Sequence, residues 1–205
     1  MADRSHDPIR PRRPIFASGT ELEALGGAID PTELVDIAHE TAAIIVRTGR
    51  ASTDPAVTAR LVELADELGL STIAQLWSER PARSLPGALW RLYVVREWVR
   101  REPIEAAREY AAGIRHTLVN HAVAGAAEPT GPAELTVLLD EVLSGVFDGD
   151  LAVALQRAAA FCRVVSAGRA EVSDGHAAAG NAAALLDTAG DLDAAAALWR
   201  NGHLS

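Results

Sequence analysis

The amino-acid sequence predicts an all-α protein: about eight or nine amphipathic helices, arranged as one bundle or as two packed helical subdomains. Alanine supplies much of the 49% hydrophobic content, and alanine has the highest helix propensity of the amino acids. Leucine, isoleucine and valine recur every three or four residues, which is the spacing of one buried helix face. Glycine and proline mostly fall between these periodic segments, where helices begin and end.

Residues 1–29 are predicted to form a flexible tail. Pro8, Pro11 and Pro14 lie close together, and proline at this density opposes helix formation. The segment 2–16 carries four arginines against two aspartates. Such a basic arm can contact phosphate or an acidic partner, and it can equally be a solvated chain end. The sequence leaves both interpretations open.

The next three helices are predicted from their caps. Asp30 and Asp54 each precede a proline, and an aspartate N-cap followed by proline is a strong helix start. These starts predict helices over 31–49 and 55–69. A short helix over 71–79 follows.

The segment 56–78 resembles a helix-turn-helix, the motif with which many transcriptional regulators bind DNA. Ala65 lies four residues before Gly69, as in the turn of that motif. Acidic side chains on the first helix of the segment would repel phosphate. The second helix has no cation before Arg80 and offers these polar side chains: Ser71, Thr72 and Gln75. An ordinary helical hairpin is therefore the alternative interpretation.

Residues 85–101 are predicted to form the central helix of the fold. Successive residues lie 100° apart around a helix, and this places Leu92, Val95 and Val99 on one side. Trp90, Val94 and Trp98 fall on nearly the opposite side. A helix that is apolar on two sides is usually buried between neighbours.

The arginines of this helix are candidate functional residues. Arg96 and Arg100 share one wedge of the helix surface, so we expect them to form an interaction face. Arg91 falls between the two apolar sides. If Arg91 is buried, it needs a carboxylate or backbone carbonyls as partners, because an unpaired buried charge is costly.

A further helix is predicted from Pro103 to about Val123, with Glu109 on its outward face. Tyr110 lies on its apolar stripe, and with Trp90 and Trp98 it is a candidate lining residue for an apolar ligand pocket. The small residues, prolines and glycines of 124–132 predict a linker. This linker would separate a subdomain over 30–124 from an Ala-rich subdomain over 132–205, or it would be a loop within one domain.

The C-terminal part is predicted as four helices. They span about 132–147, 151–168, 173–189 and 191–199, and glycines separate the later ones. The last two helices, with Gly190 and Asp191 between them, resemble one helix pair of a tetratricopeptide-type repeat. No second repeat of that period is found, so we expect a single antiparallel hairpin.

Composition narrows the chemistry. The 28 acidic residues outnumber the 19 basic ones, for a net charge of −9, which makes nonspecific nucleic-acid binding unfavourable. All the basic residues are arginine, so lysine chemistry is excluded. Cys162 is the one cysteine, and no signal peptide or run of about 20 apolar residues is found. We expect a cytoplasmic protein without a membrane span, metal or cofactor.

The segment 84–100, with 14–27 upstream, resembles small all-helical proteins of GC-rich Gram-positive bacteria. That group has no established activity, so the resemblance implies a bacterial setting and a helical fold but no catalytic or ligand residue. The sequence contains no metalloprotease, nucleophile-elbow or phosphate-loop motif.

Three functions remain open at this level. The leading hypothesis is a non-enzymatic protein that acts through protein–protein interaction or scaffolding, with an unknown partner or as a homodimer. The alternatives are a DNA-binding regulator that uses 56–78, and a small-ligand-binding helical sensor.

Overall fold

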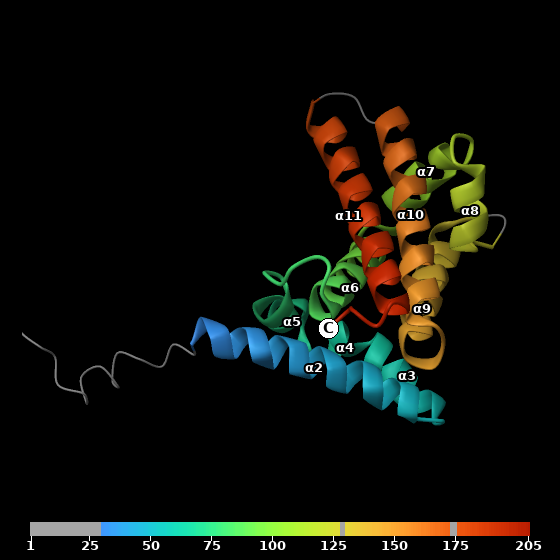
Figure 1. The fold of residues 1–205 in the computed structure, drawn as a ribbon. Coiled ribbons are helices and arrows are strands. Elements are labelled where there is room, and N and C mark those ends of the chain that lie inside the picture. Colours follow the sequence, from blue (N-terminus) through green and yellow to red (C-terminus); the bar gives the residue numbers. More distant parts are fainter. Residues whose placement is uncertain (1–29, 128–129, 173–175) are drawn as a thin grey trace, which may run out of the picture.

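A computed structural model describes residues 30–127, 130–172 and 176–205, and these residues form ten helices with no strand among them (Figure 1). The predicted all-α class is confirmed, while the predicted tail 1–29 lies outside the described residues. The helices are α2 (Pro31–Ala51), α3 (Pro55–Val62), α4 (Leu64–Leu68), α5 (Leu70–Trp77), α6 (Leu85–Arg101), α7 (Pro103–Ile114), α8 (Leu118–Ala124), α9 (Pro132–Asp148), α10 (Leu151–Val172) and α11 (His176–Arg200).

The predicted helix starts follow from local hydrogen bonds. The side chain of Asp30 accepts from the backbone N–H of Thr32, and that of Asp54 accepts from Ala56, both at 2.9 Å. Ser84 caps α6 by accepting from Gly87 N–H at 3.3 Å. Each bond satisfies a backbone donor that has no partner within the helix itself.

The helix at the centre of the fold is α10 rather than the predicted α6. Thirteen of its 22 residues are buried, and α7, α8, α9 and α11 all pack against it. In Figure 1, α10 and α11 run side by side, with α7, α8 and α9 on the other side of α10. By length and composition alone this helix could cross a membrane, but 72% of its most apolar window is buried inside the protein. Its apolar character therefore fits a core helix.

One core joins the two predicted subdomains. Helix α7, before the 124–132 segment, packs along α10, which follows it. The buried apolar residues form one cluster that extends from Ala38 on α2 to Leu204 near the last residue. The segment 124–132 is thus a loop between packed helices, the second of the two possibilities that the sequence leaves open.

Three glycines predicted as helix ends lie inside helices. The first, Gly49, lies two residues before the end of α2. Gly190, the predicted turn of the closing hairpin, lies within α11, which runs unbroken from His176 to Arg200. Gly168, the predicted end of its helix, lies within α10. The hairpin is therefore α10 and α11 rather than two short helices after residue 172.

Gly168 marks the place where α10 crosses α7 in backbone contact. A Cβ atom added at Gly168 would lie 2.6 Å from the carbonyl carbon of Glu109 and 2.7 Å from the amide nitrogen of Gly113, and closer still to the Glu109 oxygen. A Cβ atom on Gly113 would likewise overlap the carbonyl of Val164. Glycine is required at both positions so that the helices can approach this closely.

Two predicted helices are broken in the structure. The helix expected over 55–69 divides into α3 and α4 at Glu63, and Gly69, with a φ of 82°, joins α4 to α5. The helix expected from Pro103 to Val123 divides into α7 and α8 at residues 115–117. At that break, the hydroxyl of Thr117 donates to the carbonyl of Gly113 at 2.8 Å.

Candidate ligand-binding site

The two apolar sides of α6 have different surroundings. Leu92, Val95 and Val99 are buried in the core. On the nearly opposite side, Trp90 and Trp98 are half-buried and Val94 is exposed. The second side therefore provides an apolar surface beside the core rather than part of the core.

This surface lines a pocket between α6 and α11, with a volume of about 390 Å³. Trp90 and Trp98 lie two turns apart on α6, eight residues or about 12 Å along the helix axis, so the pocket is elongated. The small residue Ala184 and the neighbouring Leu185 form part of the facing wall on α11. The full lining is Ser78, Trp90, Arg91, Val94, Val95, Trp98, Arg169, Asn181, Ala184, Leu185 and Thr188.

Arg169 of α10 is fixed at one end of the pocket. Its Nε and Nη2 each donate to Glu109 at 2.7 Å, and the Glu109 side chain is only 4% exposed. The guanidinium carbon lies 5.0 Å from the centre of the Trp98 ring, in a cation–π contact. A two-bond arginine–carboxylate pair is both strong and geometrically specific, so Arg169 is held in one orientation.

Arg91 lies at the other end, beside Trp90. Its Nη1 donates to the carbonyl of Gly87 at 3.0 Å, and its Nη2 pairs with Asp191 at 3.2 Å. A carboxylate and a backbone carbonyl are the two kinds of partner that a partly buried arginine requires. Arg91 is therefore satisfied within the fold.

The charged groups that line the pocket are both cations. Arg91 and Arg169 contribute to the wall, whereas no aspartate or glutamate within the described ranges lines it. The carboxylates that hold the two arginines, Asp191 and Glu109, lie outside the lining set. The pocket thus presents apolar walls with positive charge at its ends.

Tyr110 does not belong to this pocket, which corrects its assignment as a candidate lining residue. Its ring is fully buried and stacks on Phe161, with ring centres 5.4 Å apart. Its hydroxyl lies 3.1 Å from His121 Nδ1, and burial raises the pKa of Tyr110 to about 12. Tyr110 is a core residue between α7 and α10.

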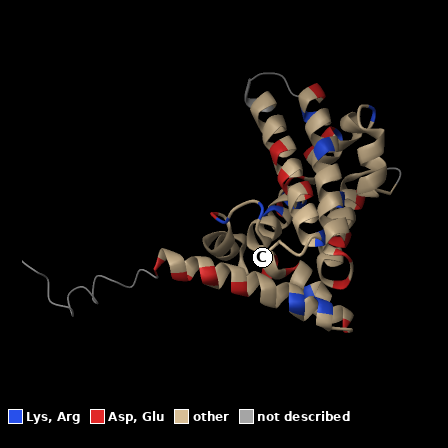
Figure 2. Ribbon diagram, in the orientation of Figure 1, with Lys and Arg blue, Asp and Glu red and all other residues tan. Residues whose placement is uncertain are grey.

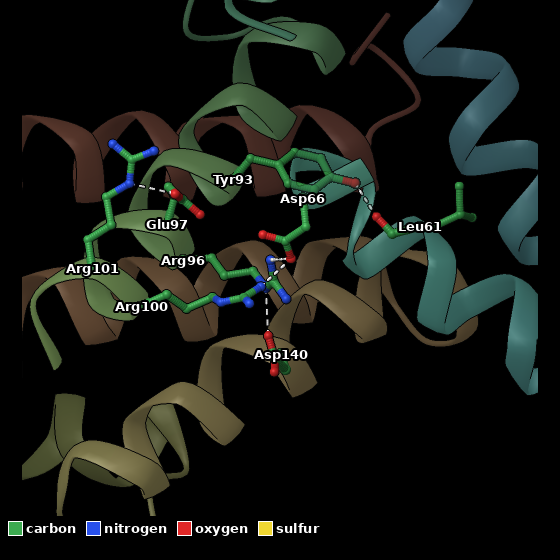
Figure 3. Close-up of polar contacts among 8 residues, drawn as sticks. All are labelled: Leu61, Asp66, Tyr93, Arg96, Glu97, Arg100, Arg101 and Asp140. Carbon is green, nitrogen blue, oxygen red and sulfur yellow. Dashed lines mark hydrogen bonds and ion pairs between the residues drawn. The ribbon is translucent and has the colours of Figure 1, made fainter. Parts of the chain in front are cut away.

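Arg96 and Arg100 do not form the predicted open interaction face, as Figure 3 shows. The Arg96 side chain is 3% exposed; its Nε donates to Asp140 at 2.6 Å and its Nη1 to Asp66 at 3.3 Å. Arg100 also pairs with Asp66. These ion pairs hold α4, α6 and α9 together: Arg96 is buried within the fold, and Arg100 is exposed but paired.

Tyr93, one turn before Arg96 on α6, supports the same junction. Its hydroxyl donates to the carbonyl of Leu61 on α3 (Figure 3). Burial raises the pKa of Tyr93 above the usual value of 10.0, although the nearby Arg96 opposes this. Tyr93 therefore stays a neutral hydrogen-bond donor.

Two larger hollows are less suited to a ligand. A groove of about 870 Å³ between α3 and α9 is lined by charges of both signs, several of which already pair with each other, as Arg96 does with Asp140. A second hollow, of about 750 Å³, lies beside α2 and Trp199. Its wall carries charges of both signs, Glu40 with Arg47 and Arg50, and Figure 2 shows the acidic residues of α2 preceding the basic ones.

The helix-turn-helix resemblance has little structural counterpart. Helix α4 has five residues, and a single glycine separates it from α5, whereas the DNA-binding motif has a turn of three or four residues. Asp66 is committed to Arg96 and Arg100. Glu63 and Glu67 are exposed beside it, where they would repel phosphate.

The part of the chain that the structure describes offers neither a metal site nor a reactive thiol. No group of three or more His, Cys, Asp or Glu side chains there is placed to hold a metal ion. Cys162 is fully buried on α10, and burial raises the pKa of its thiol to about 12. A thiol in this environment is a packing group rather than a nucleophile.

Sequence reasoning missed Glu109 and Arg169, and it also missed the α11 lining residues Asn181, Ala184, Leu185 and Thr188. Glu109 was expected on the outward face of its helix, yet it is buried at the crossing with α10. Glu109 and Arg169 are 60 positions apart, so no local spacing links them. The glycines at 113 and 168, which bring the two backbones together, are the one signal in the sequence.

No protein-family model, curated protein or solved structure matches this chain. The site is therefore interpreted from its own geometry.

Proposed function

We propose that this protein binds a small molecule in the pocket between α6 and α11. The observation that carries the proposal is the pair of half-buried indoles, Trp90 and Trp98, along one elongated pocket of about 390 Å³. Ligand pockets typically have volumes of about 300–1,000 Å³ and apolar or aromatic walls with a few placed polar groups. This pocket has both properties.

The walls are also held in place before any ligand arrives. Arg169 is fixed by Glu109 and stacks on Trp98, and Arg91 is fixed by Asp191. Groups that are already ordered lose little conformational entropy on binding, which favours affinity. Since the sequence has no catalytic motif, we propose a sensor or carrier rather than an enzyme, and we place it in the cytoplasm.

Filling the pocket tests the proposal. Ala184 lines the pocket, whereas the adjacent Ala183 is exposed and does not. A library of metabolites is screened by thermal shift against the unmodified protein and against Ala184→Trp and Ala183→Trp. We expect at least one compound to raise the Tm of the unmodified protein and of Ala183→Trp, but not of Ala184→Trp. The absence of any such compound, or equal shifts in all three proteins, would refute the proposal.

Self-association is the second candidate function, and it keeps the homodimer form of the interaction hypothesis. Helix α8 exposes Leu118 (66%), Val119 (77%) and Val123 (48%), and its sequence has no acidic residue and no arginine. An uncharged apolar face can meet its own copy across a two-fold axis without charge repulsion. Light scattering should give a dimer mass that Val119→Arg converts to a monomer; a monomer mass for the unmodified protein removes this candidate.

A further inference from the structure

We infer that the molecule bound between α6 and α11 is a carboxylate with an elongated aromatic body, and that Arg169 and Asn181 receive its anionic end. This inference rests on the proposed function and assigns the chemical class of its ligand. The elongated shape follows from the two indoles, which are about 12 Å apart along α6. Arg169 covers one face of Trp98, so half-buried Trp90 is the ring on which an aromatic ligand would stack.

The sign of the ligand's charge follows from the lining. Arg91 and Arg169 are the charged residues among those that line the pocket within the described part of the chain. The two guanidinium groups attract an anionic ligand. They repel a cationic ligand, and no carboxylate on the wall offsets that repulsion. The Trp98 face that would otherwise attract a cation is already occupied by Arg169.

The hydrogen bonds that Arg91 and Arg169 already make indicate which of them can bind the ligand carboxylate. Both Nη atoms of Arg91 are engaged, one by the Gly87 carbonyl and one by Asp191. Glu109 engages Nε and Nη2 of Arg169, and within the described residues Nη1 of Arg169 has no hydrogen-bond partner. Arg169 therefore has N–H donors to offer a ligand.

An arginine in this fold already bridges two carboxylates. Arg96 donates from Nε to Asp140 and from Nη1 to Asp66. With Glu109 on one edge of its guanidinium group and a ligand carboxylate at Nη1, Arg169 would take the same arrangement. The Glu109 charge lowers the attraction of Arg169 for an anion but does not occupy the Nη1 donors.

Asn181 lies at the same end of the pocket as Arg169. Ser166 of α10 donates to the carbonyl of Ala182 at 2.7 Å, which places the residue after Asn181 beside α10, about one helical turn from Arg169. Asn181 lines the pocket and is exposed, so its amide group is available to donate to a carboxylate oxygen. The two donors therefore come from different helices, α10 and α11, at one end of the pocket.

A matched pair of probes tests the assignment. Binding of biphenyl-4-carboxylate and of its neutral isostere biphenyl-4-carboxamide is measured by isothermal titration calorimetry on the full chain. We expect the carboxylate to bind at least about tenfold more tightly, because hydrogen bonds to a charged group are stronger than neutral ones.

Two variants report on the anchor. The double change Glu109→Gln with Arg169→Gln removes both charges together, so that neither is left buried and unpaired. Asn181→Asp places a negative charge at the same end on an exposed side chain, where the fold is not affected. We expect both variants to abolish the preference for the carboxylate, so that the ratio of the two affinities falls to about one. The control pair Arg163→Gln with Asp193→Asn, which removes an α10–α11 ion pair outside the pocket, should leave both affinities unchanged.

The possible failures are distinguishable. Equal binding of carboxylate and carboxamide, with both lost in Ala184→Trp, overturns the anionic assignment and leaves the proposed ligand pocket standing. A carboxylate preference that persists in Asn181→Asp also overturns the assignment. Binding of neither probe, or binding that Ala184→Trp does not reduce, overturns the assignment together with the pocket for ligands of this class.

Discussion

Gly168, at the α7–α10 crossing, should be among the least replaceable glycines of the described residues. In Gly168→Ala, the new Cβ would lie 2.6 Å from the carbonyl carbon of Glu109 and 2.7 Å from the Gly113 nitrogen. Both are backbone atoms, so no side-chain rotation relieves the overlap and the helices must separate. Overpacking a core typically costs about 1–3 kcal/mol, occasionally more, and the better helix propensity of alanine returns up to about 1 kcal/mol. Because backbone has to move, the cost falls at the upper end of that range or above it, and we expect a net loss of about 2 kcal/mol or more.

Gly190→Ala is the matched control on the neighbouring helix. A Cβ atom at Gly190 would meet nothing within 4 Å, and the residue lies inside α11. Alanine should therefore stabilise the protein by up to about 1 kcal/mol. Urea unfolding followed by far-UV circular dichroism measures both free energies. A Gly168→Ala variant as stable as the unmodified protein would refute the backbone contact, and a destabilised Gly190→Ala variant would refute the continuity of α11.

The remaining predictions concern buried charge, the thiol and pH. Arg96→Met should lower the free energy of unfolding by about 1–2 kcal/mol. This is less than the roughly 3–5 kcal/mol of a broken buried pair, because its partner Asp140 stays 41% exposed to water. A loss of more than about 2 kcal/mol contradicts this reasoning. Cys162 should react with a thiol reagent only after unfolding, since it is fully buried. Fast labelling of the native protein would contradict the burial of this thiol. The hydrogen bond from His116 lowers the pKa of Glu171 from 4.5, so stability from this contact is present above pH 4.5 and declines as the pH falls through the lower native pKa. Thermal melts across that range should show a decline that Glu171→Gln reduces, and identical profiles for the two proteins would contradict it.

Local signals in this sequence define helix starts well. The bounds of α6, Leu85–Arg101, agree with the predicted 85–101, because Ser84 and Pro86 mark its start and Pro103 follows its end. The caps at Asp30 and Asp54 are equally local. Cap chemistry depends on residues two or three positions away, so one sequence contains all the information needed.

Glycine carries an ambiguous signal, and this accounts for most errors in the predicted fold. Gly69 and Gly125 have positive φ angles and do end helices. Gly168 and Gly190 lie within helices, the first because a second backbone approaches it and the second in an open position with no neighbour within 4 Å. The residue type is the same in all four places, and only the tertiary structure decides between these roles.

The functional residues show the same division between local and long-range information. The helical periodicity of α6 identified Trp90 and Trp98 as a second apolar side, and these two residues line the pocket. The periodicity could not show that Asp66 and Asp140, 30 and 44 positions from Arg96, turn that arginine inward. Nor could it place Arg169 against Trp98, since α10 lies far along the chain.

The indole N–H resonances of the four tryptophans give the most direct test of the central claim, that α6 and α11 enclose a ligand pocket. Trp77 is buried, with its Nε1 donating to Thr41 at 3.3 Å, and Trp199 lies beside α2, so both serve as internal references. On titration with biphenyl-4-carboxylate, the resonances of Trp90 and Trp98 should shift while those of Trp77 and Trp199 stay in place. Unchanged Trp90 and Trp98 resonances at saturating probe, or equal shifts of all four, would contradict a ligand pocket at this site.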